Sequence, residues 1–179
     1  MTVALLPSSF AGYIANVDLE TVAAALAPRL VAYATGRTGC RSEGEDIAQE
    51  ALAALVLRWR RFGSPESPEA FVFAIARRRA ARARVRRALT RPLDFLLATR
   101  AAENGIDSYE RRAEIQMVVK TIKRLRSSDR EVLLLRAAGE LSLDEIATVT
   151  RSSVAAVKMR LHRARSRLTQ LLEEASHAR

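Results

Sequence analysis

Apolar residues recur every three to four positions along most of the chain, which is the spacing of helices that bury one face. The first such stretch predicts a helix over 19–35, whose buried side includes Leu26 and Leu30. Two glycines follow it, Gly36 and Gly39, and we expect them to end the helix. The sequence therefore predicts that a helical domain begins in the first third of the chain.

Two further helices are predicted in the same domain, one that runs to about Arg61 and one over 68–88. Ser67 is a suitable cap for the later helix. Pro68 would then occupy the first helical position, where its missing N–H costs nothing. The Thr-Arg-Pro sequence at 90–92 interrupts the pattern, so we expect this helix to end before it.

Three serines are followed by a glutamate three residues later, which is the spacing of a capping box. In this motif the hydroxyl accepts a backbone N–H while the carboxylate reaches back to the cap. Gly139 stands between the last two of these pairs as a stop signal. The pairs predict where the second helix and two later helices begin: Ser42 with Glu45, Ser128 with Glu131, and Ser142 with Glu145.

The last of these helices and the one that follows it have the layout of a helix-turn-helix. The second helix has a buried stripe at Val154, Val157, Leu161, Ala164 and Leu168. From Arg151 to Arg167 there are six basic residues and no acidic one. A solvated basic face would explain a lone basic helix. The capped helix in front of it and the missing acids favour nucleic acid as the partner.

Composition narrows the class of protein. Thirty Lys and Arg against twenty Asp and Glu give a net charge of +10, which attracts a polyanion without preventing a packed core. Almost half of the residues are apolar and Gly and Pro are scarce, so we expect an all-α chain. One cysteine, Cys40, fits a reducing cytosol. No apolar run reaches the roughly 18 residues of a membrane span, which predicts a cytoplasmic protein without membrane insertion.

The charge is distributed unevenly. Residues 18–57 carry six acids and three arginines, whereas residues 58–91 carry eleven arginines and two glutamates. This asymmetry predicts two surfaces with different partners, one a polyanion and the other a protein.

The predicted third helix carries much of the positive charge. Arg78, Arg82 and Arg86 are spaced by four and form a column on one face. Phe71 and Ile75 begin the face that the column continues. A nucleic-acid surface would place arginines on phosphates and apolar or aromatic groups beside bases. Taken singly, the two apolar residues are explained better as core.

Three blocks of the sequence, in this order, resemble bacterial sigma factors of the extracytoplasmic-function (ECF) group: Glu45-Asp46-Ile47-Ala48-Gln49-Glu50-Ala51-Leu52, Ala70-Phe71-Val72-Phe73-Ala74-Ile75-Ala76-Arg77, and Arg130-Glu131-Val132-Leu133-Leu134-Leu135-Arg136 with the helix-turn-helix. The resemblance covers about 19–172. It implies two small all-α domains on a flexible linker, with this division: an N-terminal extension at 1–17, sigma region 2 at 18–90, the linker at 91–108 and sigma region 4 at 109–175.

The resemblance implies a promoter-specificity subunit of bacterial RNA polymerase that melts the −10 element and binds the −35 element. It implies that the acidic second helix binds the clamp helices of core polymerase through Asp46, Gln49 and Glu50, although a solvated helix face explains these residues equally well. In the group, the loop before the third helix receives a base flipped out of the stack. The residues implied at the −10 element are Arg61, Phe62, Gly63, Ser64, Phe71, Arg77, Arg78, Arg82 and Arg86.

The helix-turn-helix would read the −35 element in the major groove. Lys158, Met159 and His162 share the outward face and are expected to lie nearest the bases. Lysine donates to guanine, whereas a methionine offers only apolar contact, for instance to a thymine methyl. The residues expected nearer the phosphates are Arg151, Arg160, Arg163 and Arg165.

The chain departs from the family pattern at positions that affect the expected promoter sequence. The departures are Val56 in place of a Trp, Arg78 and Arg82 in place of Asn and Asp, Ala155-Ala156 in place of Gly-Thr, and Met159 in place of a small polar residue.

Two other classes of protein fit parts of the sequence. A stand-alone helix-turn-helix regulator would bind duplex DNA tightly without polymerase, but the remote basic helix favours the sigma interpretation. An enzyme acting on nucleic acid would need a metal-spaced or nucleophilic cluster, and His162 and His177 are isolated. We therefore expect no catalysis, no metal and no cofactor. The expected partners are core RNA polymerase, promoter DNA and, by the resemblance, an anti-sigma factor.

Overall fold

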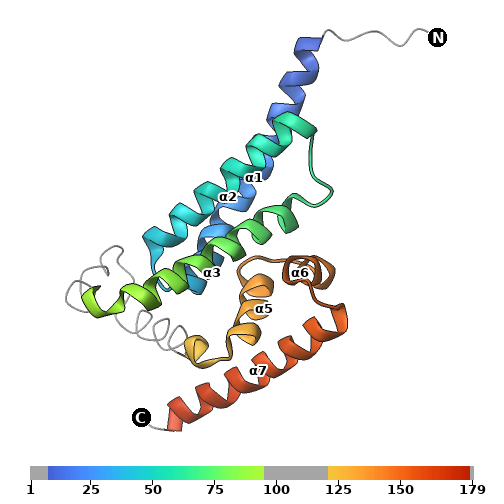
Figure 1. Ribbon diagram of the computed structural model, residues 1–179. Helices are drawn as coiled ribbons and strands as arrows, with labels where there is room; N and C mark the ends of the chain where they lie inside the picture. The colour runs from blue at the N-terminus through green and yellow to red at the C-terminus, as the bar shows by residue number, and fades with distance from the viewer. Residues whose placement is uncertain (1–7, 95–120, 178–179) are drawn as a thin grey trace.

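The structure is a computed structural model that describes residues 8–94 and 121–177, with side chains described in 19–86 and 121–174. The described residues form helices and no strand, which confirms the all-α prediction. One group of helices packs side by side and a second group lies against it (Figure 1). The helices are α1 (Ser8–Thr38), α2 (Arg41–Phe62), α3 (Pro68–Asp94), α5 (Ser127–Ala137), α6 (Leu143–Thr150) and α7 (Val154–His177).

Helices α1, α2 and α3 form the first domain around a closely packed core. Leu30 and Tyr33 of α1 and Leu55 of α2 are fully buried. Complete burial of one such side chain stabilises the fold by about 1.5–3 kcal/mol. Helix α3 meets the other two through mostly small residues, which let the helices approach closely, and these residues form its predicted buried stripe: Val72, Ala76, Ala80 and Ala83.

Helices α5, α6 and α7 form the second domain. Val157, Leu161 and Ala164 of α7 are buried as the spacing predicts, while Val154 and Leu168 at the two ends of the stripe are half-buried. The facing helices contribute buried side chains of their own, namely Val132, Leu135, Ile146 and Val149. The amphipathic pattern of the sequence therefore gives the correct inward face of this domain.

The two domains are in direct contact and share one hydrophobic core. Leu134 and Leu141 belong to the same buried cluster as Tyr33 and Phe73. The rings of Tyr33 and Phe73 meet edge to face, with centroids 5.5 Å apart. Gly139 follows α5 at this point, and a Cβ there would lie 3.0 Å from the Phe73 ring. Only glycine leaves room for so close an approach.

The first helix is longer than predicted. It begins at Ser8 instead of Leu19 and continues through Gly36 to Thr38. A glycine inside a helix costs roughly 1 kcal/mol, which packing on both sides of α1 offsets. Gly39 ends the helix as predicted, with a φ of 77° and its N–H donating to the Thr35 carbonyl at 2.7 Å.

The predicted break at 90–92 is wrong, because α3 continues to Asp94. Pro92 lies in the last turn, where the loss of one backbone hydrogen bond interrupts little helix. The rest of the predicted linker, 95–108, and the start of the second predicted domain, 109–120, lie outside the described residues. No helix in the described ranges is both long and apolar enough to cross a membrane.

Two of the predicted helix caps are confirmed. The Ser67 hydroxyl accepts the Ala70 N–H at 3.1 Å at the start of α3. At α6 both halves of the capping box form, because the Ser142 hydroxyl accepts the Glu145 N–H at 3.2 Å and the carboxylate accepts the Ser142 N–H at 2.8 Å. These bonds satisfy donors that the helix itself leaves unpaired.

The other two predicted capping boxes are wrong. Helix α2 begins one residue earlier than Ser42, with Cys40 as its cap, and Glu45 pairs with Arg41 at 2.8 Å. Helix α5 has no side-chain cap either, since its capping position is Arg126. Its Glu131 is drawn instead into a buried ion pair described below. In both cases an arginine competes successfully for the glutamate.

Candidate nucleic-acid interface

The turn between α6 and α7 is fixed by its own hydrogen bonds. Arg151 adopts the left-handed conformation at φ 53° and ψ 48°, and its N–H donates to the Thr148 carbonyl at 3.2 Å. Ser153 caps α7, since its hydroxyl accepts the Ala156 N–H at 3.2 Å. This turn sets the angle between the two helices, as a helix-turn-helix requires.

The outward face of α7 carries the side chains predicted to lie nearest the bases. Lys158 and His162 are exposed, and Met159 keeps 59% of its surface in solvent. The exposed Ala155 lies one turn earlier on the same side. A large exposed apolar side chain between two donors is suited to contact with base edges.

Two arginines of α7 are held within the domain. Arg160 Nη1 donates to the Ser152 hydroxyl at 2.9 Å and so ties the helix to the turn. Arg163 Nη2 lies 3.3 Å from the carboxylate of the buried Asp129 on α5. The remaining predicted phosphate contacts, Arg151 and Arg165, are exposed.

The end of α2 presents an aromatic ring to solvent, next to the loop that follows the helix. Phe62 is 65% exposed, and the guanidinium groups of Arg58 and Arg61 each lie 5.1 Å from its ring centroid. Arg58 Nη1 also donates to the Gly63 carbonyl at 2.9 Å. Gly63 has a φ of 75°, a conformation that favours glycine. Cation–π contact therefore holds the exposed ring at the start of the loop.

Sequence analysis missed Arg58. Its spacing of four residues from Phe62 on a helix places the two side chains together, and this spacing was the available signal.

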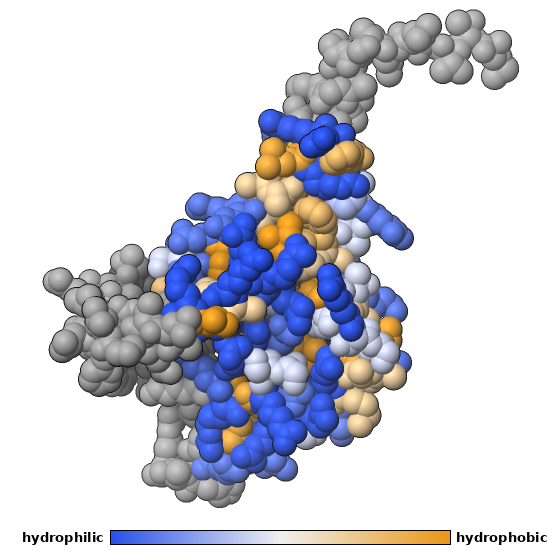
Figure 2. Space-filling model, viewed as in Figure 1, coloured by the Kyte–Doolittle hydropathy of each residue, from blue (hydrophilic) through white to orange (hydrophobic). Residues whose placement is uncertain are grey.

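Most of the arginine column on α3 faces solvent. Arg78 and Arg82 are exposed, and Arg86 is exposed while it pairs with Glu43 at 3.2 Å. The viewed face of the molecule is dominated by hydrophilic residues with small apolar patches between them (Figure 2). Phe71 is half-buried against the shared core, which agrees with the interpretation that it is a core residue.

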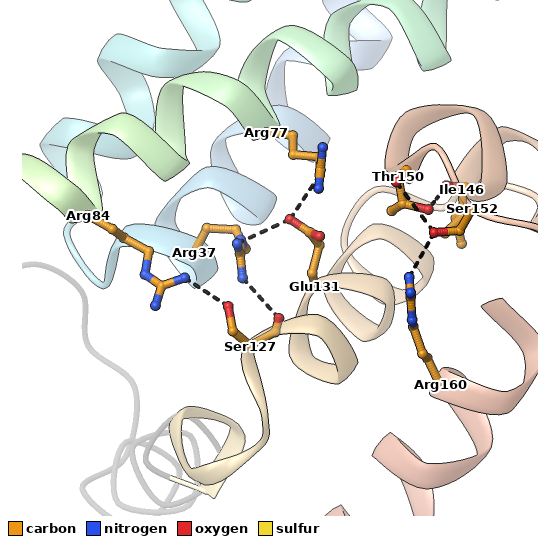
Figure 3. A network of polar contacts seen from close by, with 9 residues as sticks. All are labelled: Arg37, Arg77, Arg84, Ser127, Glu131, Ile146, Thr150, Ser152 and Arg160. Carbon is orange, nitrogen blue, oxygen red and sulfur yellow. Dashed lines mark hydrogen bonds and ion pairs between the residues drawn. The ribbon is translucent and has the colours of Figure 1, made fainter. Parts of the chain in front are cut away.

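Arg77 is not part of that exposed column. Its Nε lies 3.2 Å from Oε1 of Glu131, across the domain boundary. Arg37 Nη2 lies 3.1 Å from the same oxygen, and its Nη1 donates to the Ser127 carbonyl at 3.4 Å (Figure 3). The side chains of Arg37 and Glu131 are only 4% and 12% exposed. Burial is the main reason that the pKa of Tyr33 lies above its ordinary value, and the nearby Glu131 carboxylate raises this pKa further. The phenol is therefore neutral.

The acidic face of α2 is accessible. Asp46, Gln49 and Glu50 are all exposed, and Glu50 pairs with Arg79 of α3 at 2.9 Å. Leu57 continues the same side of the helix seven residues beyond Glu50 and is 71% exposed. Sequence analysis missed Leu57, although its seven-residue spacing from Glu50 was visible. An exposed leucine beside acidic and amide groups is suited to contact with another protein.

Two families match the chain in the order of its domains. Sigma-70 region 2 matches residues 22–90, and Sigma-70, region 4 matches residues 115–168. The ECF RNA polymerase sigma factor ShbA of Streptomyces griseus is 31% identical over 137 residues, which are 73% of this chain and 72% of ShbA. The chain therefore belongs to the ECF RNA polymerase sigma factors, as the motifs predicted.

Solved structures have the same fold. The sigma factor RpoE of Bartonella quintana, in complex with the anti-sigma factor NepR, matches with a TM-score of 0.66 and 24% identity over 87% of this chain and 97% of RpoE. CnrH, in complex with the cytosolic domain of CnrY, matches with a TM-score of 0.63 and 25% identity over 87% of this chain and 88% of CnrH. The protein is a promoter-specific transcription initiation factor that acts with RNA polymerase, and the stand-alone regulator is not favoured.

Proposed function

We infer that the outward face of α7 reads the −35 element. Lys158 and His162 supply donors for base edges, and Met159 supplies apolar contact. The exposed Arg151 and Arg165 contact phosphates on either side. Arg160 and Arg163 help to orient α7 through their partners on the turn and on α5. The observation that supports this role is the exposure of the base-reading residues on a helix whose turn is fixed.

The −10 element is opened by the first domain. Phe62 stacks on an unpaired base while Arg58 and Arg61 hold its ring, and Gly63 and Ser64 line the space beside it. Arg78, Arg82 and Arg86 contact the phosphates that follow. Stacking of one base on an aromatic side chain contributes about 1–3 kcal/mol, which offsets the few kcal/mol needed to unstack it.

The acidic face of α2 binds core RNA polymerase. Asp46, Gln49 and Glu50 contact basic or polar groups of the clamp helices, and Leu57 adds an apolar anchor. Apolar anchors surrounded by polar groups supply much of the affinity at protein interfaces.

An anti-sigma factor is a further proposed partner. This proposal is supported by the RpoE structure, in which a chain of the same fold is bound to the anti-sigma factor NepR. It predicts that a stoichiometric protein inhibitor exists that lowers transcription by this chain without cutting or modifying it.

The observation that carries the proposed function is that one chain exposes two separate basic surfaces on different domains, one beside Phe62 with the arginine column of α3 and the other around Met159. The test is transcription in vitro from a randomised promoter library with sigma-free core polymerase. We expect start sites that share a two-part upstream motif and are absent without the protein. No stimulation, together with tight binding of duplex DNA by the chain alone, would overturn the proposal in favour of a stand-alone regulator.

A further inference from the structure

The bend that ends α2 lies at Phe62 and Gly63. Phe62 is the last residue of the helix, and Gly63 follows it as the C-terminal cap, with its N–H donating to the Trp59 carbonyl at 2.8 Å. Gly63 turns the chain out of the helix at a φ of 75°, which glycine adopts without the strain that a side chain would cause. The bend therefore sets where the exposed Phe62 ring stands relative to the loop.

Arg58 contacts both sides of this bend. Its guanidinium carbon lies 5.1 Å from the centroid of the Phe62 ring, and its Nη1 donates to the Gly63 carbonyl at 2.9 Å. One planar group thus binds the side chain before the turn and the backbone after it. Arg58 lies four positions before Phe62, so its side chain reaches the bend from the preceding turn of α2.

The two other arginines at the end of α2 differ from Arg58, which is half-buried. Arg61 is exposed and lies 5.1 Å from the same ring centroid, but no hydrogen bond among the described residues ties it to the bend. Arg60 is also exposed and lies two positions from Phe62, where helical side chains do not face each other. Arg58 is therefore placed to order the bend, and Arg60 is a control of the same charge.

An ordered ring captures a base at a lower cost than a mobile one. The Phe62 ring is 65% exposed, so packing alone does little to fix its position. A side chain or loop that must be ordered on binding costs free energy, and order already present in the free protein removes that cost. A guanidinium within about 6 Å orders the ring. The hydrogen bond from Arg58 orders Gly63, since glycine has the most backbone freedom to lose.

We propose that Arg58 is a positioning residue for promoter opening. It fixes the Phe62 ring and the Gly63 backbone in the free chain, so that an unpaired base meets a surface already in place. The proposal rests on the proposed function, because it requires that Phe62 receives the base. Arg58 acts through the ring and the bend without contacting DNA itself. Arg61 differs in role, since its exposed charge remains available to phosphates.

The first test measures whether Arg58 orders the ring before DNA is present. Phe62 is replaced by 4-fluorophenylalanine in the full chain, and its fluorine NMR resonance is compared with that of the chain unfolded in urea. We expect Arg58→Gln to move the resonance toward the unfolded position and Arg60→Gln to leave it in place. Arg58→Met, which keeps the apolar stem but has no donor, is the second variant if circular dichroism shows that Arg58→Gln does not fold. A resonance that a folded Arg58 variant does not move would overturn the proposal.

The second test is a double-mutant cycle on promoter opening, with each variant in excess over core polymerase. Permanganate reactivity near −10 measures the open complexes. We expect Arg58→Gln to lower them roughly tenfold, the combined effect of one exposed cation–π contact and one hydrogen bond. In a Phe62→Ala background the same change should lower them by less than about twofold, because the ring that Arg58 positions is absent. Losses that multiply would show that Arg58 acts independently of Phe62 and would overturn the proposal.

The dependence of promoter binding on salt separates positioning from direct contact with DNA. Loss of one phosphate contact lowers the slope of log affinity against log salt concentration by about one, so Arg58→Gln should leave the wild-type slope unchanged. A slope lowered by about one, or an equal loss of opening in Arg60→Gln, would overturn the proposal.

The failure of this proposal is distinguishable from the failure of the proposed function. Normal opening by Arg58→Gln beside defective opening by Phe62→Ala would overturn the positioning role alone. Normal opening by Phe62→Ala would overturn the proposed base contact, and the positioning role with it.

Discussion

Ser67 and Glu145 each cap a helix in their own domain, and they also bind each other across the domain boundary. The Ser67 hydroxyl accepts the Ala70 N–H of α3 and donates to the Glu145 carboxylate at 3.1 Å. The same carboxylate completes the capping box of α6 through the Ser142 N–H. The starts of α3 and α6 are therefore coupled, although 78 residues separate the two side chains in sequence.

The stability that Glu145 provides should depend on pH. Burial of the carboxyl raises its pKa, but hydrogen bonds from Ser142 and Ser67 lower it by more, so the pKa in the folded chain lies below its ordinary value. A lowered pKa in the folded state contributes stability above about pH 4.3, which is lost as the pH falls through the folded value.

We expect Glu145→Gln to lower the free energy of unfolding at pH 7 by about 0.5–2 kcal/mol, the range for loss of a helix cap. The difference from wild type should shrink toward pH 3. Urea unfolding at several pH values measures it. A difference that stays constant from pH 7 to pH 3 would contradict the role of the ionised carboxylate.

Lys158→Ala and Arg82→Ala should have different effects across a panel of promoters. Lys158 is placed to contact bases, so its loss should weaken only particular −35 sequences, by about 1–3 kcal/mol. Arg82 is placed on phosphates, so its loss should weaken all promoters about equally and reduce the dependence on salt. Competitive transcription from the panel compares the two variants, and identical profiles would contradict the assignment of roles.

Phe62→Ala should impair promoter opening without destabilising the fold, because the ring is already 65% exposed. Loss of stacking on one base predicts roughly a 5- to 150-fold decrease in open complexes. Permanganate reactivity of unpaired thymines near −10 measures them. The matched control is Val85→Ala, an apolar residue of the same domain that is 61% exposed. Equal loss of opening in both variants would show that Phe62 has no specific role.

Leu57→Ala should weaken binding to core polymerase by about tenfold, which corresponds to 1.4 kcal/mol for one apolar anchor. Its 71% exposure predicts an unchanged melting temperature. Binding to sigma-free core polymerase is measured by fluorescence anisotropy of the labelled chain. Phe62→Ala serves as the reciprocal control, since it should bind core normally. Normal binding by Leu57→Ala would show that Leu57 is not part of the surface that binds polymerase.

Gly139→Ala should destabilise the contact between the domains. The added Cβ would lie 2.6 Å from the Leu135 carbonyl oxygen and 3.0 Å from the Phe73 ring, so the backbone or the ring must move. Overpacking of this kind costs about 1–3 kcal/mol. Thermal unfolding should show a lower midpoint. A midpoint equal to that of wild type would contradict this prediction, because it would mean that the domain boundary accommodates the added Cβ without loss of stability.

Much of this protein follows from local sequence. Three- and four-residue spacing determines which faces of α3 and α7 are buried, because the period of a helix is independent of what it packs against. The outward face at Lys158, Met159 and His162 follows from the same periodicity. The motif blocks were sufficient to predict the ECF family, which the relative ShbA confirms.

Competition with arginines decides which of the predicted capping boxes form. Serine and glutamate have the same spacing at 42–45, 128–131 and 142–145, yet only the last pair forms a capping box. In the other two pairs the glutamate binds arginine, and for Glu131 those arginines lie 94 and 54 positions earlier in the chain. At Glu131 a buried ion pair between the domains overrides the local capping preference of about 1 kcal/mol, which only the tertiary structure decided. At Glu45 the competing arginine is local, since the exposed Arg41 lies four residues earlier on the same helix.

The sequence by itself therefore determined the family, the helices and the side chains that α7 exposes. Only the tertiary structure decided that the two domains share a core, that Arg77 faces Glu131 instead of solvent, and that Gly139 lies against Phe73. The physical reason is that helical periodicity is a property of neighbouring residues. Contact between domains depends on shape and charge brought together from opposite ends of the chain, which no local pattern encodes.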